Sequence, residues 1–493
     1  MMLDFEKTNQ ALFDFLNRSP VPFYAVRNMK EVLDRAGFAE LCEGDWWTLE
    51  PGASYYVSRN DSALIAFRLP REKAIGFQIM ASHCDSPVFK IKANAEITVE
   101  NRYVRLNVEK YGGMLCAPWL DRPLSVAGRI VLETEDPAGP GTAAGSGNSA
   151  GSGTAAGSEN CTGSGTAAGS GTTPGPGSLS AGIETRLVNV DRDLLIIPNL
   201  AIHMNRGAND GFPYNAQTDL LPLFAQAPEP GGDRDTSGLF LSLIAKEAGV
   251  CPDRILDADL YLYNRMPAAY IGQDREFIAS GRLDNLQCAF ASLQGILNAR
   301  PSRSVAVHCV YDNEEVGSGT RQGAGSTFLR DVLHRISAAL GNTEEDYLRA
   351  LTSSFMVSAD NAHSVHPNHP EKADPTNRPC MNKGIVIKYS ANQKYTTDAV
   401  SGAIFRQICR RADVPFQTFA NRSDMIGGST LGNISQAHVA VPTVDVGLAQ
   451  LAMHSPFETA GAKDTAYLAE AARILFSGSV EGRGDGTYRL YFS

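Results

Sequence analysis

Four apolar segments, three of which end directly in a short polar cluster, constrain the fold of this sequence most. These segments lie at 74–81, 304–311, 354–358 and 440–446. Helical patterns at 285–297 and 327–340 lie between them. Nearly continuous apolar strands that alternate with helices are typical of a sheet buried on both faces. The pattern therefore predicts an α/β domain with a mixed, largely parallel sheet.

The middle of the chain has a different pattern. With 493 residues the chain is too long for one hydrophobic core. Between about Val88 and Ala248 the apolar residues form short alternating stretches, at 95–108, 124–133 and 187–197, separated by glycine and proline. We predict a β-rich domain at 89–248, inserted into a domain made of 1–88 and 249–493.

A low-complexity segment lies within the predicted insertion. Residues 137–182 are almost wholly Gly, Ser, Ala, Thr and Pro. Such a segment has too little apolar surface to offset the entropy lost on ordering, so we predict that it is disordered. A phosphate-binding glycine loop is excluded because no apolar strand precedes the segment and no helix follows it.

Charge and composition exclude several kinds of partner. The net charge is -10 and no long run of Lys and Arg occurs, which argues against nucleic acid. No stretch approaches the roughly 20 apolar residues of a membrane span. Near the N-terminus, Phe5, Leu12 and Leu16 recur at helical spacing and predict a packing helix rather than a signal peptide. Nine cysteines without a Cys-x-x-Cys pair favour the reducing cytoplasm.

The polar clusters follow the apolar segments directly. The first segment leads into Ser82-His83-Cys84-Asp85, the second into Asp312-Asn313-Glu314-Glu315, and the third into Asp360-Asn361-Ala362-His363. Two more clusters occur at Leu283-Asp284-Asn285 and Met453-His454-Ser455. Because ligands bind at the carboxyl edge of open α/β sheets, we expect these clusters to converge there.

Together the clusters supply two histidines and at least three carboxylates, a set that suits zinc, manganese or cobalt. A shared carboxylate is the usual way to hold two ions about 3.5–4 Å apart. Each residue alone is more often part of a surface turn or a helix cap. The adjacent Glu314 and Glu315 would repel each other at the end of a buried strand unless cations neutralised them, although on an exposed turn they would merely be solvated.

The same clusters resemble motifs of the aspartyl aminopeptidases, the M18 metallopeptidases, of bacterial type. The similarity extends from the N-terminal helix to about residue 470, apart from the low-complexity segment. The matching motifs occur in the order of the family and are Ser82-His83-Cys84-Asp85-Ser86-Pro87, Tyr111-Gly112-Gly113, Ile197-Pro198-Asn199-Leu200-Ala201-Ile202-His203, Arg282-Leu283-Asp284-Asn285-Leu286, Glu314-Glu315-Val316-Gly317-Ser318, Ser358-Ala359-Asp360-Asn361-Ala362-His363 and Met453-His454-Ser455.

The resemblance implies a zinc-exopeptidase-like catalytic domain that binds two divalent ions, with zinc expected and manganese or cobalt as alternatives. His83 and Asp360 would hold one ion, Glu315 and His454 the other, and Asp284 would bridge them. Glu314 would be the general base that takes a proton from the attacking water. Asp85 would hydrogen-bond the second nitrogen of the His83 ring and fix its tautomer.

For substrate binding, the resemblance implies that Tyr395 stabilises the oxyanion and that Lys388 faces the β-carboxylate of an acidic N-terminal residue. From the residues alone, Lys388 is more often a surface lysine that closes a strand. His363 belongs to the same predicted substrate site. His203 would reach the active site of a neighbouring subunit, whereas its apolar surroundings in the sequence are more typical of a core histidine. The inserted domain would mediate dimerisation, and dimers would form a homododecamer.

The predicted function is a metallo-aminopeptidase that removes N-terminal residues, preferring Asp and Glu, from peptides with a free N-terminus. A preference for neutral residues such as Leu remains open because Phe457, Asn421 and Gly427 depart from the usual pattern of the family. Two further alternatives are another di-metal amidohydrolase and a non-catalytic scaffold. The first would accept a substrate without a free α-amine, and the second would lack a ligand or the base.

Overall fold

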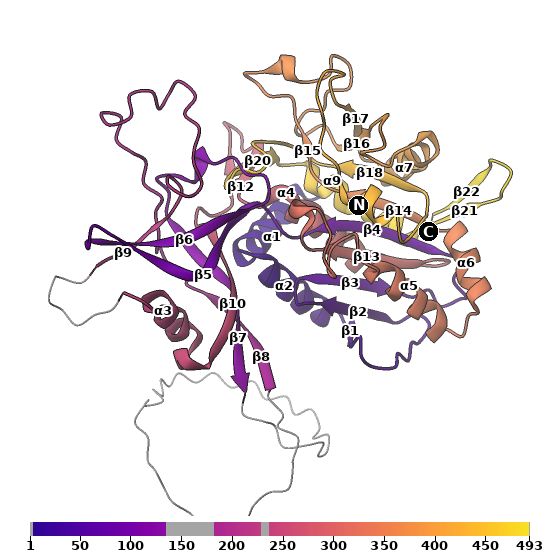
Figure 1. Ribbon diagram of the computed structural model, residues 1–493. Helices are drawn as coiled ribbons and strands as arrows, with labels where there is room; N and C mark the ends of the chain where they lie inside the picture. Colours follow the sequence, from indigo (N-terminus) through magenta and orange to yellow (C-terminus); the bar gives the residue numbers. More distant parts are fainter. Residues whose placement is uncertain (1–2, 135–181, 228–235, 493) are drawn as a thin grey trace, which may run out of the picture.

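The computed structural model describes residues 3–134, 182–227 and 236–492. These residues form a larger unit around a nine-stranded sheet and a smaller unit around a six-stranded sheet (Figure 1). The predicted disordered segment at 137–182 lies outside the described residues except for Gly182. None of the described helices has the length and apolar character needed to cross a membrane.

The sheet of the larger unit is mixed and mostly parallel. Five of its eight neighbouring strand pairs are parallel, which confirms the predicted α/β class. From edge to edge, the strands are β1 (Ala39–Leu41), β2 (Ser54–Arg59), β3 (Ala63–Arg68), β13 (Val305–Tyr311), β4 (Phe77–His83), β14 (Phe355–Ala359), β18 (Thr443–Gly447), β16 (Ile385–Tyr389) and β17 (Phe416–Ala420).

Helices cover both faces of this sheet. One face packs against α1 (Phe5–Arg18), α2 (Pro22–Arg35), α4 (Leu283–Asn298), α7 (Ala399–Ala412) and α9 (Asp464–Ser477). The other face packs against α5 (Phe328–Ala339), α6 (Glu344–Thr352) and α8 (Leu431–Ser435). Strand β13 shows why its sequence is apolar throughout. Ala306 and Val310 belong to the first core, and Val307 and Cys309 to the second, because successive side chains point to opposite faces.

The predicted strands and helices of the larger unit correspond to real elements. The four apolar segments overlap β4, β13, β14 and β18, and the two helical patterns cover most of α4 and all of α5. The N-terminal pattern forms α1, which buries Leu12 and Leu16 and is capped by the Asp4 carboxylate. The predicted packing helix is thus confirmed.

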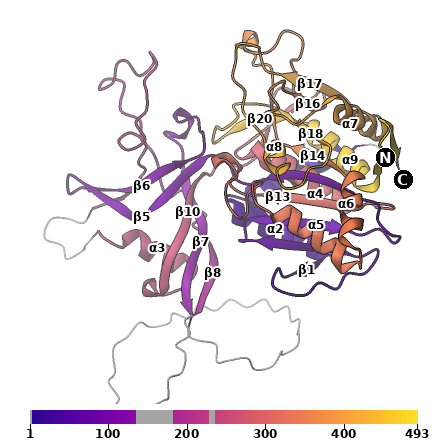
Figure 2. The same ribbon diagram turned by 45° about the vertical axis from the view of Figure 1, so that its right-hand side comes forward.

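The smaller unit is an antiparallel sheet with one helix, α3 (Leu239–Ala248), packed on it. Figure 2 shows this unit at the side of the larger one. Its strands, in order, are β8 (Gly182–Asn189), β7 (Leu124–Thr134), β10 (Ile255–Asn264), β5 (Val88–Val99), β6 (Tyr103–Tyr111) and β9 (Leu223–Gln226).

Two details differ from the expectations for this unit. Strand β10 lies beyond residue 248, the expected end of the insertion, yet it pairs along its length with β7. We therefore propose that the inserted domain continues to Asn264. The stretch at 187–197 is not one strand, because β8 ends at Asn189 and only isolated bridges follow at Leu195 and Ile196. The polar run Asp191-Arg192-Asp193 separates the two parts.

A five-stranded sheet completes the larger unit near the junction of the two units. Its strands, in order, are β11 (Ala269–Ile271), β12 (Phe277–Ser280), β20 (Glu458–Gly461), β19 (Ala449–Leu451) and β15 (Ala362–His363). A hairpin of β21 (Ser479–Gly482) and β22 (Tyr488–Tyr491) follows α9. The chain enters the smaller unit between His83 and Val88, so the first polar cluster lies at the crossing between the units.

Candidate active site

Three of the polar clusters meet at one edge of the nine-stranded sheet. Strand β4 lies between β13 and β14 and is parallel to both. His83 ends β4 and is paired with Tyr311 at the end of β13. A short 3-10 turn with Glu314 and Glu315 follows β13, and Asp360 follows β14. Parallel register thus brings residues from distant parts of the chain to the same edge.

The other two clusters arrive from outside this sheet. Asp284 lies in the first turn of α4. Its φ of -82° and ψ of 107° are not helical, so the backbone departs from regular helix geometry at this ligand position. His454 lies between β19 and β20 and has a φ of 68°. Pairing of Ser280 with Glu458 brings the segments that carry these two residues together.

The five predicted metal ligands form two groups that share Asp284. In one group, His83 Nε2 lies 3.5 Å from Asp360 Oδ1 and 3.7 Å from Asp284 Oδ1. In the other, His454 Nε2 lies 3.4 Å from Glu315 Oε2 and 3.6 Å from Asp284 Oδ2. The two oxygens of Asp284 therefore face different histidines, as required of a bridging carboxylate.

The geometry of these groups fits metal ions. Their N···O distances are longer than ordinary hydrogen bonds, but they are close to the edge of a tetrahedron with metal–ligand bonds of zinc length, about 3.3–3.5 Å. Asp284 Oδ1 is buried and has no hydrogen-bond partner among the described residues. An orphaned buried carboxylate oxygen is costly unless a cation is bound to it. The residues present therefore fit a pair of divalent ions.

The electrostatics of the cluster also favour cations. Burial and the neighbouring Asp360 and Glu458 raise the pKa of Asp284 well above its usual range. Burial, and after it the charge of Asp284, also raises the pKa of Glu315 well above its usual range. Asp360 behaves differently because Lys388 and a hydrogen bond with His83 outweigh burial and hold its pKa low. Bound cations would remove the repulsion among these carboxylates.

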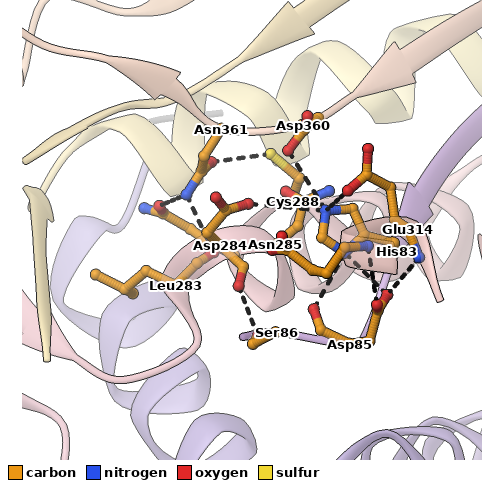
Figure 3. Close-up of polar contacts among 12 residues, drawn as sticks. His83, Asp85, Ser86, Leu283, Asp284, Asn285, Cys288, Glu314, Asp360 and Asn361 are labelled. Carbon is orange, nitrogen blue, oxygen red and sulfur yellow. Dashed lines mark hydrogen bonds and ion pairs between the residues drawn. The ribbon is translucent and has the colours of Figure 1, made fainter. Parts of the chain in front are cut away.

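Glu314 and Asp85 lie on opposite sides of the His83 ring system. Glu314 Oε2 is 4.0 Å from His83 Nε2, and burial raises the pKa of Glu314 to about 7. Asp85 Oδ1 is 3.3 Å from His83 Nδ1, and the Asp85 backbone carbonyl is 3.1 Å from the same nitrogen. Figure 3 shows Asp284, Glu314 and Asp360 gathered around His83, with Asp85 below the ring.

Most of the predicted site residues line one cavity, which has a volume of about 460 Å³. Of the predicted site residues, it contains His83, Asp284, Glu314, Glu315, Asp360, His363, Lys388, Tyr395 and His454. Asp85 is buried behind His83. His203 is the exception, because it lies in an exposed turn of the smaller unit and does not line the cavity of its own chain. The alternative of a buried core histidine is wrong for His203.

Lys388 is buried rather than at the surface, which excludes the alternative of a solvated strand end. Its Nζ donates a hydrogen bond to the Asn361 carbonyl oxygen at 2.7 Å and lies 3.6 Å from Asp360 Oδ2. The ammonium group also lies 5.4 Å from the ring centre of Tyr395, which is buried in the cavity wall. A cation and an aromatic hydroxyl thus stand beside the ligand groups.

Glu458 is a site residue that the sequence motifs did not reveal. Its buried carboxylate accepts the backbone N–H of Asp284 at 3.0 Å and that of His454 at 2.8 Å. It therefore holds together two ligand-bearing segments from distant parts of the chain. The available signal was a single carboxylate four residues after His454, followed by the small residues Thr459-Ala460-Gly461.

An α/β fold with two groups of candidate metal ligands at the carboxyl edge of its sheet fits a metallohydrolase. The profile of a family described as "Aminopeptidase I zinc metalloprotease (M18)" matches residues 15–140 and 178–476. The chain belongs to this M18 family and is a metallo-aminopeptidase, a hydrolase that acts on the N-terminal residues of peptides.

Individual relatives agree with this assignment. The "Probable M18 family aminopeptidase 2" of Clostridium novyi (strain NT) is 43% identical over 458 residues, which cover 92% of this chain and 95% of the relative. The structure of an Ape4 and Nbr1 complex matches with a TM-score of 0.84 and 33% identity over 97% of this chain and 87% of that one. The mApe1 dodecamer of S. cerevisiae matches with a TM-score of 0.75 and 25% identity over 96% and 98%.

Proposed function

We propose that this aminopeptidase uses two divalent metal ions, with zinc as the native metal, and prefers peptides that begin with Asp or Glu. The observation that carries the two-metal proposal is the division of Asp284, whose Oδ1 faces His83 and whose Oδ2 faces His454. Asp360 completes the first group and Glu315 the second. The description of the family as zinc metalloproteases supports the choice of metal.

When bound, the two ions would polarise a water molecule and the scissile carbonyl. Glu314 would accept the proton of that water and deliver it to the departing amine. Its position on the wall of the cavity, 4.0 Å from His83, supports this role. Asp85 would keep His83 Nδ1 engaged, so that Nε2 presents its lone pair to the cavity. Tyr395 would donate a hydrogen bond to the oxyanion.

Lys388 supports the acidic preference. A substrate carboxylate that enters a partly dry cavity needs a cation, because an unpaired charge there is costly. Lys388 is the buried ammonium group of this cavity wall, and only one of its three protons is used by the Asn361 carbonyl. The distance from Lys388 Nζ to Asp360 Oδ2 is 3.6 Å, which is longer than a hydrogen bond. Protons of the ammonium group therefore remain to bind a second carboxylate.

The proposed setting is a homododecamer, built from dimers, in the cytoplasm. The dodecameric mApe1 relative supports the assembly. Exposed apolar side chains of the smaller unit, including Leu200, Ile202 and Met204, support a contact surface there. His203 lies in the same turn, so we keep the proposal that it reaches a neighbouring active site. The free thiols of Cys84, Cys288 and Cys309 are consistent with a reducing compartment.

Two substitutions test the proposed chemistry. Asp284→Asn should lose metal and activity together, because one carboxylate serves both ions. Glu314→Gln should retain roughly two ions per chain while kcat falls by at least ~10²-fold. Metal content is measured by elemental analysis. Turnover is measured on a dipeptide with a free N-terminus and on its N-acetylated form. Wild-type turnover by Glu314→Gln would remove Glu314 from the mechanism, and equal cleavage of the acetylated peptide would favour a different amidohydrolase.

A further inference from the structure

We propose that the segment 111–113, at the end of β6 in the smaller unit, positions the metal ligands of the larger unit on both sides of the centre. The inference rests on the proposed two-metal function. Tyr111 and Gly113 contact the site through a hydroxyl group and a carbonyl oxygen, and Gly112 leaves room beside Glu315 that a side chain would occupy. None of the three is itself a ligand.

Tyr111 acts on the His83 side. Its hydroxyl donates a hydrogen bond to Asp85 Oδ2 at 2.8 Å and accepts one from Asn313 Nδ2 at 2.8 Å. Asp85 in turn accepts the backbone N–H groups of Glu314 and Glu315, each at 3.1 Å. The phenol therefore orients the carboxylate that holds both the His83 ring and the turn that carries the adjacent glutamates.

Gly112 and Gly113 act on the other side. Gly112 has a φ of +76°, and a Cβ at this position would lie 3.1 Å from the Glu315 Cβ. The absence of a side chain at Gly112 therefore leaves the space that the Glu315 side chain needs at its present position. The carbonyl oxygen of Gly113 accepts a hydrogen bond from His454 Nδ1, which leaves Nε2 directed toward Asp284 and Glu315.

The smaller unit anchors this segment through the ring of Tyr111. That ring packs edge-to-face on Tyr261 of β10, with ring centres 5.9 Å apart. The ammonium group of Lys90 lies over Tyr261 and pairs with Asp259 at 2.8 Å. The position of the Tyr111 hydroxyl is thus set by packing within the six-stranded sheet. The smaller unit is therefore a structural part of the metal centre within a single chain.

Tyr111→Phe separates positioning from packing, because it removes the hydroxyl and keeps the ring. We expect zinc affinity, measured by competition with a chromophoric chelator, to fall by about 10- to 100-fold, as is typical for loss of a group that orients a ligand. The absorption spectrum of the cobalt-loaded protein should change as well. Tyr263→Phe is the matched control. It removes a hydroxyl of the same sheet that donates to Asn189 Oδ1 at 2.8 Å, away from the cavity, and should bind zinc like the wild type.

A double-mutant cycle provides the second measurement. Since Tyr111 acts through Asp85, adding Tyr111→Phe to Asp85→Ala should change zinc affinity little further. Full additivity, or a Tyr111→Phe protein within about 2-fold of wild-type affinity, would overturn the inference. So would an equal loss in Tyr263→Phe, which would indicate a general effect on the sheet. A wild type that binds no zinc would instead refute the proposed function.

Discussion

Lys388 lies beside the carboxylate of Asp360 at the wall of the cavity, and a substrate carboxylate is its second proposed partner. Asp360 faces His83 with Oδ1 and Lys388 with Oδ2, so one carboxylate links the ligand group to the buried ammonium group. Although burial lowers the pKa of Lys388, the charge of Asp360 more than compensates and raises it. The lysine is therefore protonated at neutral pH and can bind the side-chain carboxylate of a substrate.

Lys388→Met should reduce the preference for acidic N-terminal residues and leave metal content unchanged. A hydrogen bond to a charged group contributes about 1.5–3 kcal/mol, so the ratio of kcat/KM for Asp over Leu should fall by roughly 10- to 100-fold. Matched Asp, Glu, Leu and Ala substrates provide the measurement. Lys394→Met, which alters an exposed lysine outside the cavity, is the control. Unchanged ratios in Lys388→Met, or a wild type that favours Leu, would refute the acidic preference.

At the residue scale, motifs identified the residues of the cavity better than their supports. Four of the cavity residues end or directly follow strands whose parallel order could be expected from the apolar pattern. They are His83, Glu314, Glu315 and Asp360. The contact of Glu458 with the backbone of Asp284 joins positions 174 residues apart. Such a contact depends on the pairing of β12 with β20, which no local pattern of the sequence specifies.

At the scale of a single element, β13 contains an unusual core residue. His308 is fully buried between the sheet and α4, where its Nδ1 lies 2.7 Å from Ser292 Oγ. Its Nε2 has no hydrogen-bond partner among the described residues. Burial lowers the pKa of His308 from 6.5 to about 3. The residue is therefore structural.

This lowered pKa predicts a pH-dependent stability. In the unfolded chain His308 takes up a proton below the ordinary histidine pKa of 6.5, whereas in the folded protein it stays neutral down to about pH 3. Its contribution is therefore present above pH 6.5 and is lost progressively as the pH falls toward 3. Between about pH 7.5 and about pH 5.5, the free energy of unfolding should fall by about 1.3 kcal/mol more in the wild type than in His308→Asn.

Urea denaturation of both proteins at the two pH values measures this difference. Asn can still hydrogen-bond Ser292 but does not titrate, so other titrating groups cancel in the comparison. Parallel pH curves for the wild type and His308→Asn would contradict the prediction.

The composition of a strand decides whether it could be predicted from the sequence. Strand β13 is buried on both faces and is apolar except for His308, so it was recognisable from its composition. Strand β10 was missed because its outward positions are polar. Asp259, for example, pairs with Lys90 and Arg129 on neighbouring strands of the smaller unit. An aspartate in a strand is uncommon unless cross-strand cations neutralise it, and those partners are distant in the sequence.

At the scale of the whole molecule, the low-complexity segment is attached at the end of a hairpin. Strands β7 and β8 pair up to Thr134 and Gly182, which are directly opposite each other. The points where the segment leaves and rejoins the smaller unit are therefore adjacent. The length of chain between them can change without altering the pairing of either strand.

Replacing residues 139–180 by a short Gly-Ser link should leave catalysis and assembly intact. Loop-closure entropy changes slowly with length, by about 0.6 kcal/mol per doubling, so stability should change little. The measurements are kcat/KM, the melting temperature and the mass in solution by light scattering. Replacing the same residues by a scrambled sequence of equal length and composition is the control. A smaller assembly or a loss of activity with the short link would reveal a structural role for the segment.

The positions of the proposed metal ligands along the chain determine when activity can appear during protein synthesis. His83 is translated early and His454 only after most of the chain, and Asp284, which both histidines face, comes between them. His454 reaches its place only when β20 pairs with β12. On the proposed ligand assignment, a partly synthesised chain contains no complete ligand set, and the peptidase would act on other nascent chains only after its own translation has passed residue 454.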